Sequence, residues 1–218
     1  LSLINQPLEN PGIAEHYVIA NRVVNKFAIA NIIGDSFLTP KDYQELEYIK
    51  NYLSELDDWN KIEVNIFSSI LPHFSIEFLD YRLYHLLDTL KKQTEYHSIR
   101  TADYYIACLR TAIKHYSVNG YYDKAEKLIY KWKLILSHES YDFITTSPLF
   151  LLNMYEVYNL LRQNNPKAIE RANAVIHYID AQNDLFPLSY MYAWKNVFIQ
   201  EVQLLNKTGI PFPTEDEE

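Results

Sequence analysis

Apolar residues recur at intervals of three and four positions along most of the chain, a spacing that places side chains on one face of an α-helix. The first such stretch covers residues 12–33 and includes Tyr17, Ala20 and Phe27. Eight further stretches follow, at about 40–56, 59–70, 76–90, 99–116, 121–137, 147–162, 166–181 and 187–206. No run of convincing length alternates apolar and polar residues as a strand does, so the pattern predicts an all-α fold of nine helices.

Residues that cap or break helices separate these stretches. Thr39 stands before Pro40, and Ser75 and Ser98 precede the fourth and fifth stretches. Hydroxyl side chains cap helix starts, and proline suits a first turn because its missing N–H has no partner there anyway. Asn119-Gly120 and Asn164-Asn165-Pro166 interrupt the later stretches, with Asn165-Pro166 expected to take the place of a turn glycine.

One pair of predicted helices has the spacing of a tetratricopeptide-like repeat. Leu109, Tyr116, Gly120, Ala125 and Ile129 combine large apolar residues with a turn glycine and a small residue. Glycine permits the tight turn, and alanine lets two antiparallel helices approach closely. We therefore expect a right-handed array of antiparallel helix pairs, a superhelix whose concave face is made by the first helix of each pair.

The pattern also suggests a division of the chain. We expect residues 1–34 to form an N-terminal helix leading into the array, and residues 35–206 to form the array itself. Residues 207–218 end in an acidic run and are expected to form a tail.

Composition excludes several classes of function. The chain has 4 glycines among 218 residues and no glycine-rich phosphate loop, which argues against Rossmann and P-loop nucleotide sites. A net charge of −8 is unsuited to direct nucleic-acid binding. The single cysteine, Cys108, excludes an internal disulfide. No apolar run approaches the length of a membrane span, and no secretory signal is visible, so we expect a cytoplasmic protein without a membrane partner.

The candidate chemistry is sparse. The seven histidines form no metal-binding spacing such as HExxH, and no GxSxG nucleophile motif is present. Cys108 lies in the middle of a predicted helix, where inert packing is expected. We therefore expect no metal, no cofactor and no enzymatic activity.

Polar residues on the predicted first helices of pairs are more informative. Asn65 and Ser69 lie four positions apart, opposite a stripe formed by Ile62 and Ile66. Arg110 and Asn153 lie on two later first helices. An asparagine amide both donates to and accepts from a peptide backbone, and an arginine can hold a carboxylate. Each residue taken singly also fits an ordinary surface position, but together Asn65, Ser69, Arg110 and Asn153 are the candidate ligand-binding set.

The last predicted helix carries more apolar surface than one core face needs. Because a terminal helix of an array must cap itself or pair with another chain, we expect a homodimer. The apolar residues concerned are Met191, Tyr192, Trp194, Val197, Phe198, Leu204 and Leu205.

The segment YLSELDDWNKIEVNIFSSILPHFSIEFL has a distinctive combination of Tyr52-Leu53, Trp59, Glu63 and Phe67. It resembles the signature block of the Rgg/GadR/MutR family of transcriptional regulators from low-GC Gram-positive bacteria. Two later segments, ACLRTAIKHYSVNGYYDKAEKLI and LFLLNMYEVYNLLRQNNPKAIERANAVIHYI, resemble the helix pairs that follow it in the family. The resemblance covers roughly residues 35–206.

The resemblance implies a function. The family joins an N-terminal helix-turn-helix DNA-binding domain to a C-terminal tetratricopeptide-like array, which dimerises and, in pheromone-responsive members, binds a short signalling peptide. This chain has no basic helix-turn-helix segment before the array, so it is expected to represent the C-terminal domain, with DNA contacted only through a domain outside it.

The resemblance also points to particular positions, at which this chain departs from the family. An Asn and an Arg near the end of the Trp-containing helix touch the peptide in relatives, and the matching positions here are Ser69 and Pro72. Pro72 cannot replace a charge, so Arg110 could supply it, the ligand could differ, or no peptide binds. The alternative function is a helical-repeat adaptor that binds a protein partner and has no transcriptional role.

Overall fold

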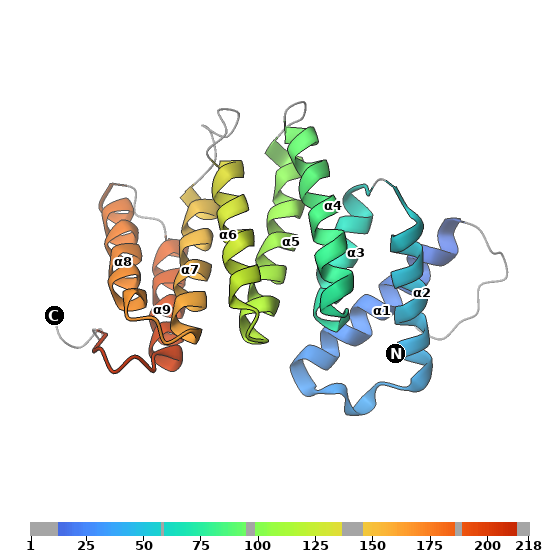
Figure 1. Ribbon diagram of the computed structural model, residues 1–218, viewed down its shortest axis with the longest axis horizontal. Helices are drawn as coiled ribbons and strands as arrows, with labels where there is room; N and C mark the ends of the chain where they lie inside the picture. Colours follow the sequence, from blue (N-terminus) through green and yellow to red (C-terminus); the bar gives the residue numbers. More distant parts are fainter. Residues whose placement is uncertain (1–12, 58, 95–98, 137–145, 186–188, 213–218) are drawn as a thin grey trace. The chain divides into compact units, whose positions relative to one another are not determined.

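The computed structural model describes residues 13–57, 59–94, 99–136, 146–185 and 189–212 (Figure 1). These residues form nine α-helices and contain no strand, which confirms the predicted all-α fold. The helices are α1 (Ile13–Ile33), α2 (Pro40–Glu55), α3 (Lys61–Ile70), α4 (Ile76–Thr94), α5 (Ile99–Val118), α6 (Tyr122–Leu136), α7 (Thr146–Arg162), α8 (Lys167–Leu185) and α9 (Ser189–Leu205). Short 3-10 turns cover Asp35–Phe37 and Leu71–His73.

The chain divides into two compact units, with the boundary between Cys108 and Leu109, inside α5. The first unit contains α1 to α4, and α1 packs against both α2 and α3. The second unit contains the C-terminal half of α5 together with α6 to α9. The right-handed superhelix stays a prediction, as does the division at residues 34 and 206.

Helix starts in the first unit follow the local chemistry of the chain. Thr39 precedes α2 as predicted, and its backbone N–H and its hydroxyl both donate to Asp42 Oδ2 at 2.7 Å. The N–H of Phe78 donates to Ser75 Oγ at 3.4 Å at the start of α4, also as predicted. The residue that caps α3 is Asn60, whose Oδ1 accepts from the N–H of Ile62 at 2.7 Å. The predicted cap Ser98 lies outside the described residues.

A buried carboxylate joins three helices of the first unit. The Glu63 side chain on α3 is buried, and its Oε1 accepts hydrogen bonds from the hydroxyls of Tyr17 on α1 at 3.2 Å and Tyr52 on α2 at 3.0 Å. Its Oε2 accepts from the backbone N–H of Asn60 at 3.1 Å. Burial raises the pKa of Tyr52, and the hydrogen bond to Glu63 raises it further, so the tyrosine remains a donor. Two residues of the signature block, Tyr52 and Glu63, therefore have a structural role.

The indole of Trp59, another residue of that block, links the next elements. Its Nε1–H donates to the carbonyl of Leu53 at 3.0 Å. The buried guanidinium of Arg82, on α4, lies 5.7 Å from the centre of the Trp59 ring and donates to the carbonyl of Ser54. The end of α2 is thereby joined both to the segment before α3 and to α4.

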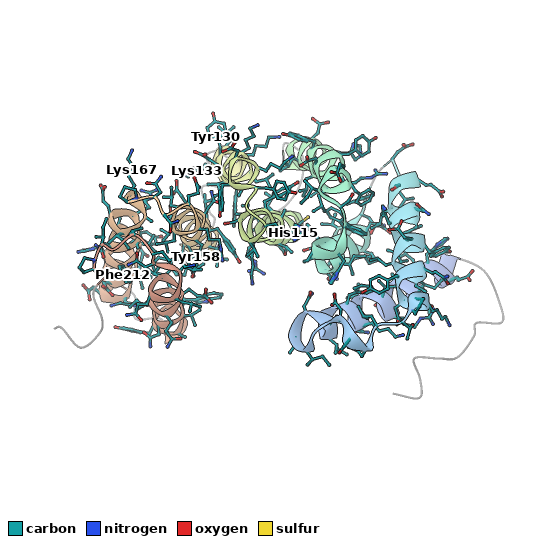
Figure 2. All side chains as sticks on the ribbon, turned by 60° about the horizontal axis from the view of Figure 1, so that its bottom comes forward. His115, Tyr130, Lys133, Tyr158, Lys167 and Phe212 are labelled. Carbon is teal, nitrogen blue, oxygen red and sulfur yellow. The ribbon has the colours of Figure 1, made fainter. Side chains whose placement is uncertain are left out.

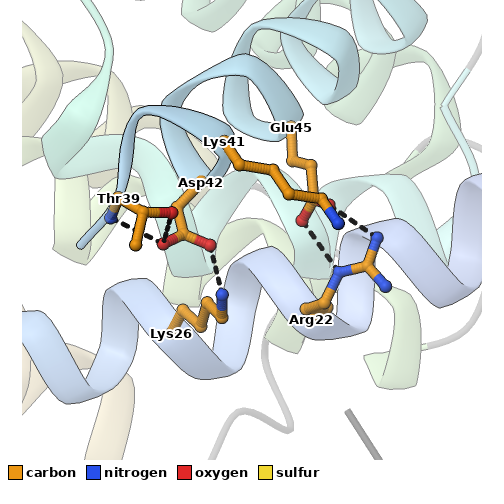
Figure 3. A network of polar contacts seen from close by, with 6 residues as sticks. All are labelled: Arg22, Lys26, Thr39, Lys41, Asp42 and Glu45. Atoms are coloured by element: carbon orange, nitrogen blue, oxygen red, sulfur yellow. Dashed lines mark hydrogen bonds and ion pairs between the residues drawn. The ribbon is translucent and has the colours of Figure 1, made fainter. Parts of the chain in front are cut away.

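Ion pairs form a second set of contacts between α1 and α2 (Figure 3). The Arg22 guanidinium donates to both carboxylate oxygens of Glu45, at 2.8 and 2.7 Å, and Lys26 pairs with Asp42. Burial by itself would raise the pKa of the Asp42 carboxyl, but hydrogen bonds from Lys26 and Thr39 outweigh it and lower that pKa. These pairs reach from the middle of α1 to the first half of α2.

In the second unit, two turns close two helix pairs. Gly120, with φ of 80°, joins α5 to α6, as predicted, and Tyr121 N–H bonds back to the carbonyl of Tyr116 at 2.9 Å. Between α7 and α8 the left-handed residue is Asn164, with φ of 53°, rather than the expected Asn165-Pro166 pair. Asparagine tolerates this conformation better than most residues because of its short polar side chain.

The core of the second unit lies around α7, which packs against α6, α8 and α9. Ala125 on α6 is fully buried, and so is the small residue Ala168 on α8, which permits the close helix approach that the repeat pattern predicted. Phe212, beyond α9, is also buried in this core, so part of the segment expected to be a tail packs on the unit. Figure 2 shows α5, α7 and α9 on one side of this unit and α6 and α8 on the other.

We expect Glu63→Ala to destabilise the protein by about 3 kcal/mol, because the hydroxyls of the half-buried Tyr17 and Tyr52 and the N–H of Asn60 lose their acceptor. Urea denaturation followed by circular dichroism measures this change. The matched control is Glu47→Ala, which removes an exposed carboxylate of α2 paired with Lys50 and is expected to cost less than about 0.5 kcal/mol. Equal effects of the two substitutions would contradict the role of Glu63.

We also expect stability to fall as the pH drops below about 6.5, through His73. Its ring meets Phe27 edge-on at 4.6 Å, its Nε2 is buried without a hydrogen-bond partner, and burial lowers its pKa below 6.5. Between that lowered value and 6.5 the unfolded state binds the proton and the folded state does not, so acid favours unfolding. Thermal melts at pH 7.5 and pH 5.5 measure the loss, which His73→Gln should reduce and the exposed-site control His177→Gln should leave unchanged. An identical pH dependence in His73→Gln would refute this origin.

Candidate functional site

The four predicted ligand-binding residues are divided between the two units. Asn65 and Ser69 lie on α3 in the first unit, and Arg110 and Asn153 lie on α5 and α7 in the second. Their convergence on a single groove therefore stays a prediction. Within the first unit, Asn65 and Ser69 are one helical turn apart, and the Ser69 hydroxyl donates to the Asn65 carbonyl at 2.8 Å.

Asn65 lines a small pocket of about 290 Å³ between α1 and α3. Tyr17 and Asn21 contribute from α1, and Lys61 and Ile62 contribute from α3. Ile62 was expected to belong to a core stripe opposite Asn65, and that expectation was wrong: Ile62 is 48% exposed and shares the pocket with Asn65. The buried stripe of α3 instead includes Glu63, whose three hydrogen bonds satisfy its carboxylate.

Asn153 is a residue of α7, whereas Arg110 is a residue of α5 and lies beside the other flank of α7. The Asn153 Oδ1 accepts a hydrogen bond from Arg171 of α8 at 3.3 Å. The next turn of the same flank carries Glu156, which pairs with Arg171 at 3.1 Å and with Lys133 of α6 at 2.6 Å. Lys133 and Tyr158 are labelled on opposite sides of α7 in Figure 2. The structure thus directs Asn153 toward α6 and α8.

Arg110, on α5, lies beside the flank of α7 that faces α5 and α9. Its half-buried side chain is close enough to Tyr155 for its charge to oppose the rise in that hydroxyl's pKa. Burial is the larger effect and raises the pKa of Tyr155, so the neutral phenol persists. Arg110 and Tyr155 therefore place a cation and a hydroxyl on the same surface.

Three further residues on this flank were missed by sequence reasoning. Tyr158 and Arg162 follow Tyr155 on α7 at intervals of three and four, and Glu201 lies across from them on α9. Burial raises the pKa of Tyr158 and lowers that of Arg162, and Glu201 acts on both in the direction of a higher pKa. The available signal was the helical spacing of Tyr155, Tyr158 and Arg162 on a first helix of a pair. We use the name α5–α7–α9 face for a set of five residues: Arg110, Tyr155, Tyr158, Arg162 and Glu201.

A second pocket of about 290 Å³ lies at one end of this face, where α5, α7 and α9 finish. Arg162 lines it and donates to the Ser117 hydroxyl at 3.3 Å. Tyr122 and Lys207 add polar groups, and Val118, Leu161 and Leu205 add apolar walls. The pocket thus offers two cations beside an apolar surface.

The chemistry of the α5–α7–α9 face favours binding. Phenol hydroxyls, guanidinium groups and a carboxylate can hydrogen-bond a ligand, and the tyrosine rings supply apolar area. Cys108 is fully buried, which raises the pKa of its thiol and removes it as a nucleophile. Among the residues that the structure describes, no three His, Cys, Asp or Glu side chains are grouped to hold a metal ion. No helix in the described ranges is both long enough and apolar enough to cross a lipid bilayer.

Comparison with known proteins identifies the family. Curated proteins gave no match, and neither did solved structures. The model of one family, described as HTH-type transcriptional regulator Rgg, C-terminal domain, matches residues 11–185, which run from the start of α1 to the end of α8. This match includes α1, which the sequence resemblance had left out, and the family is one of regulators and not of enzymes. The chain therefore belongs to the Rgg family of helix-turn-helix transcriptional regulators, in which residues 11–185 correspond to the C-terminal domain.

Proposed function

We propose that this domain binds a short signalling peptide and relays its binding to a DNA-binding domain outside these 218 residues. The observation that carries the proposal is the α5–α7–α9 face, where Arg110 and Arg162 lie with two tyrosines and Glu201. The proposed setting is the cytoplasm, where such a regulator meets DNA.

An extended peptide suits this face for a physical reason. Its backbone N–H and C=O groups need partners once they leave water, and the hydroxyls of Tyr155 and Tyr158 can both donate and accept. Arg110 can hold an acidic group of the ligand through a charge-assisted bond. Asn153 contributes by holding Arg171 beside Glu156. The part that Asn65 and Ser69 of the first unit play stays a prediction.

The relay follows from differential affinity. A peptide that binds one arrangement of the helix pairs more tightly than another shifts the population toward it. A ligand held between the tyrosines of α7 and Glu201 would change how α7 packs. Because α7 contacts α6, α8 and α9, such a change would reach these three helices. The attached DNA-binding domains would sense this change through the dimer.

Homodimerisation is the second part of the proposal. Trp194, Val197 and Leu204 recur on one side of α9 and are exposed, as is Tyr192. Leu204 is 75% exposed, an unusual position for a leucine in a helix that contributes Phe198 and Val202 to the core. A partner copy covering these side chains would remove this apolar area from water.

Peptide binding is tested by mass spectrometry of peptides that co-purify with the protein, followed by calorimetry with the peptide identified. We expect Arg110→Ala to lower the affinity for that peptide by about tenfold, which is the effect of losing one charge-assisted hydrogen bond. The control Lys127→Ala removes an exposed cation of α6 and should leave the affinity unchanged. Recovery of a folded protein partner in place of a peptide would instead favour the adaptor function, and unchanged affinity in Arg110→Ala would remove this residue from the site.

Dimerisation is tested by light scattering at micromolar concentration. We expect a dimer for the unmodified chain and a monomer for Leu204→Glu, because a carboxylate in an apolar interface loses its hydration. The matched control is Leu134→Glu on α6, where the leucine is 52% exposed and the dimer should persist. A monomeric unmodified chain would refute the proposal.

A further inference from the structure

The pocket where α5, α7 and α9 end has a polar side that carries two cations, Arg162 and Lys207. Arg162 is half-buried there, and its hydrogen bond is to the neutral hydroxyl of Ser117 at 3.3 Å. Within the described residues Arg162 forms no ion pair, and the carboxylate that influences it, on Glu201, lies beyond ion-pairing distance. The second cation, Lys207, lines the same pocket from beyond the end of α9.

The charge at this pocket exceeds what the helix ends require. Each helix C-terminus carries about half a negative charge, so the ends of α5, α7 and α9 together offset most, but not all, of the charge of the two cations, the first of which is Arg162, the last residue of α7. Lys207 adds a second full positive charge.

We propose that this pocket binds a carboxylate group, and that in a bound peptide the group is the C-terminal carboxylate. The inference rests on the proposed peptide-binding function and names the end of the peptide that the pocket holds. A guanidinium presents paired N–H donors that match the two oxygens of a carboxylate. The buried Ser117 hydroxyl, which accepts from Arg162, keeps a hydrogen that it can donate to the same ligand.

The apolar wall of the pocket suits the last side chain of a peptide. Val118, Leu161 and Leu205 line the pocket beside the two cations, and its volume of about 290 Å³ accommodates a terminal residue and not a longer segment. A peptide chain that continues from there along α7 meets Tyr155, which is half-buried, beyond the buried Tyr158.

The position of Arg110 on α5, relative to the Ser117 that Arg162 contacts, supports the same register. Arg110 precedes Ser117 by two helical turns, which is about 10 Å at 1.5 Å per residue. An extended peptide covers that distance in about three residues. A carboxylate at Arg162 therefore places Arg110 beside a residue about three positions before the end of the ligand.

The test uses the full 218-residue chain and three defined probes in titrations followed by amide and arginine NMR signals. The probes are N-acetyl-trileucine, its C-terminal amide, and N-acetyl-Leu-Leu-Glu-amide, whose only carboxylate is on a side chain. We expect N-acetyl-trileucine to shift the signals of Ser117, Arg162 and Leu205 saturably, and each of the other two probes to bind about tenfold more weakly.

Substitutions test whether the stronger binding of the acid than of its amide arises in this pocket. Arg162→Gln should abolish the difference between the acid and its amide, whereas Lys127→Gln, which removes an exposed cation of α6, should preserve it. Ser117→Ala, which removes the hydroxyl that Arg162 contacts, should reduce the difference.

Several outcomes would overturn the proposal. Equal binding of acid and amide along Tyr155 and Tyr158 would leave peptide binding standing and remove the carboxylate site. Equal binding of the side-chain acid would refute the assignment to the peptide terminus, and tighter binding of inorganic phosphate than of N-acetyl-trileucine would refute the carboxylate class. No shift with any probe would refute the carboxylate site, and the co-purified peptide then tests the proposed function separately.

Discussion

The buried carboxylate of Glu63 is the interaction on which the first unit depends. It accepts hydrogen bonds from α1, from α2 and from the backbone at the start of its own helix. A carboxylate out of water is costly unless its lone pairs are satisfied, so the three donors must be present together. Glu63 therefore specifies how three helices meet, as well as capping one of them.

The signature residues around Glu63 extend this arrangement. Trp59 bonds the end of α2 through the Leu53 carbonyl, and Arg82 brings α4 onto the ring of Trp59. The segment whose sequence resembles the family's signature block therefore holds neighbouring helices together in this chain. The extent of the family match, which begins before α1, agrees with this packing, because Tyr17, Arg22 and Lys26 of α1 all bond to the helices that follow.

The second unit depends on α7, a helix whose two flanks contact different neighbouring helices. One flank carries Asn153 and Glu156 and is tied to α6 and α8 by Lys133 and Arg171. The other flank carries Tyr155, Tyr158 and Arg162, whose partners are α5 and α9. The first flank holds the helix in place through ion pairs, and the second flank is the one on which we propose that a peptide binds.

The sequence by itself determined the helices, the turns and the family. Helix hydrogen bonds join residues four apart, so caps such as Thr39 and Ser75 and the breaker at Gly120 act locally and can be recognised in the sequence. Only the tertiary structure decided which polar residues meet. Helical periodicity assigns a residue to a face but not to a neighbour, and for this reason Ile62 proved exposed beside Asn65, and Asn153 turned toward Arg171. The contacts of Glu63 with Tyr17 and of Arg162 with Ser117 join positions more than 40 residues apart, and only the packing of whole helices brings such positions together.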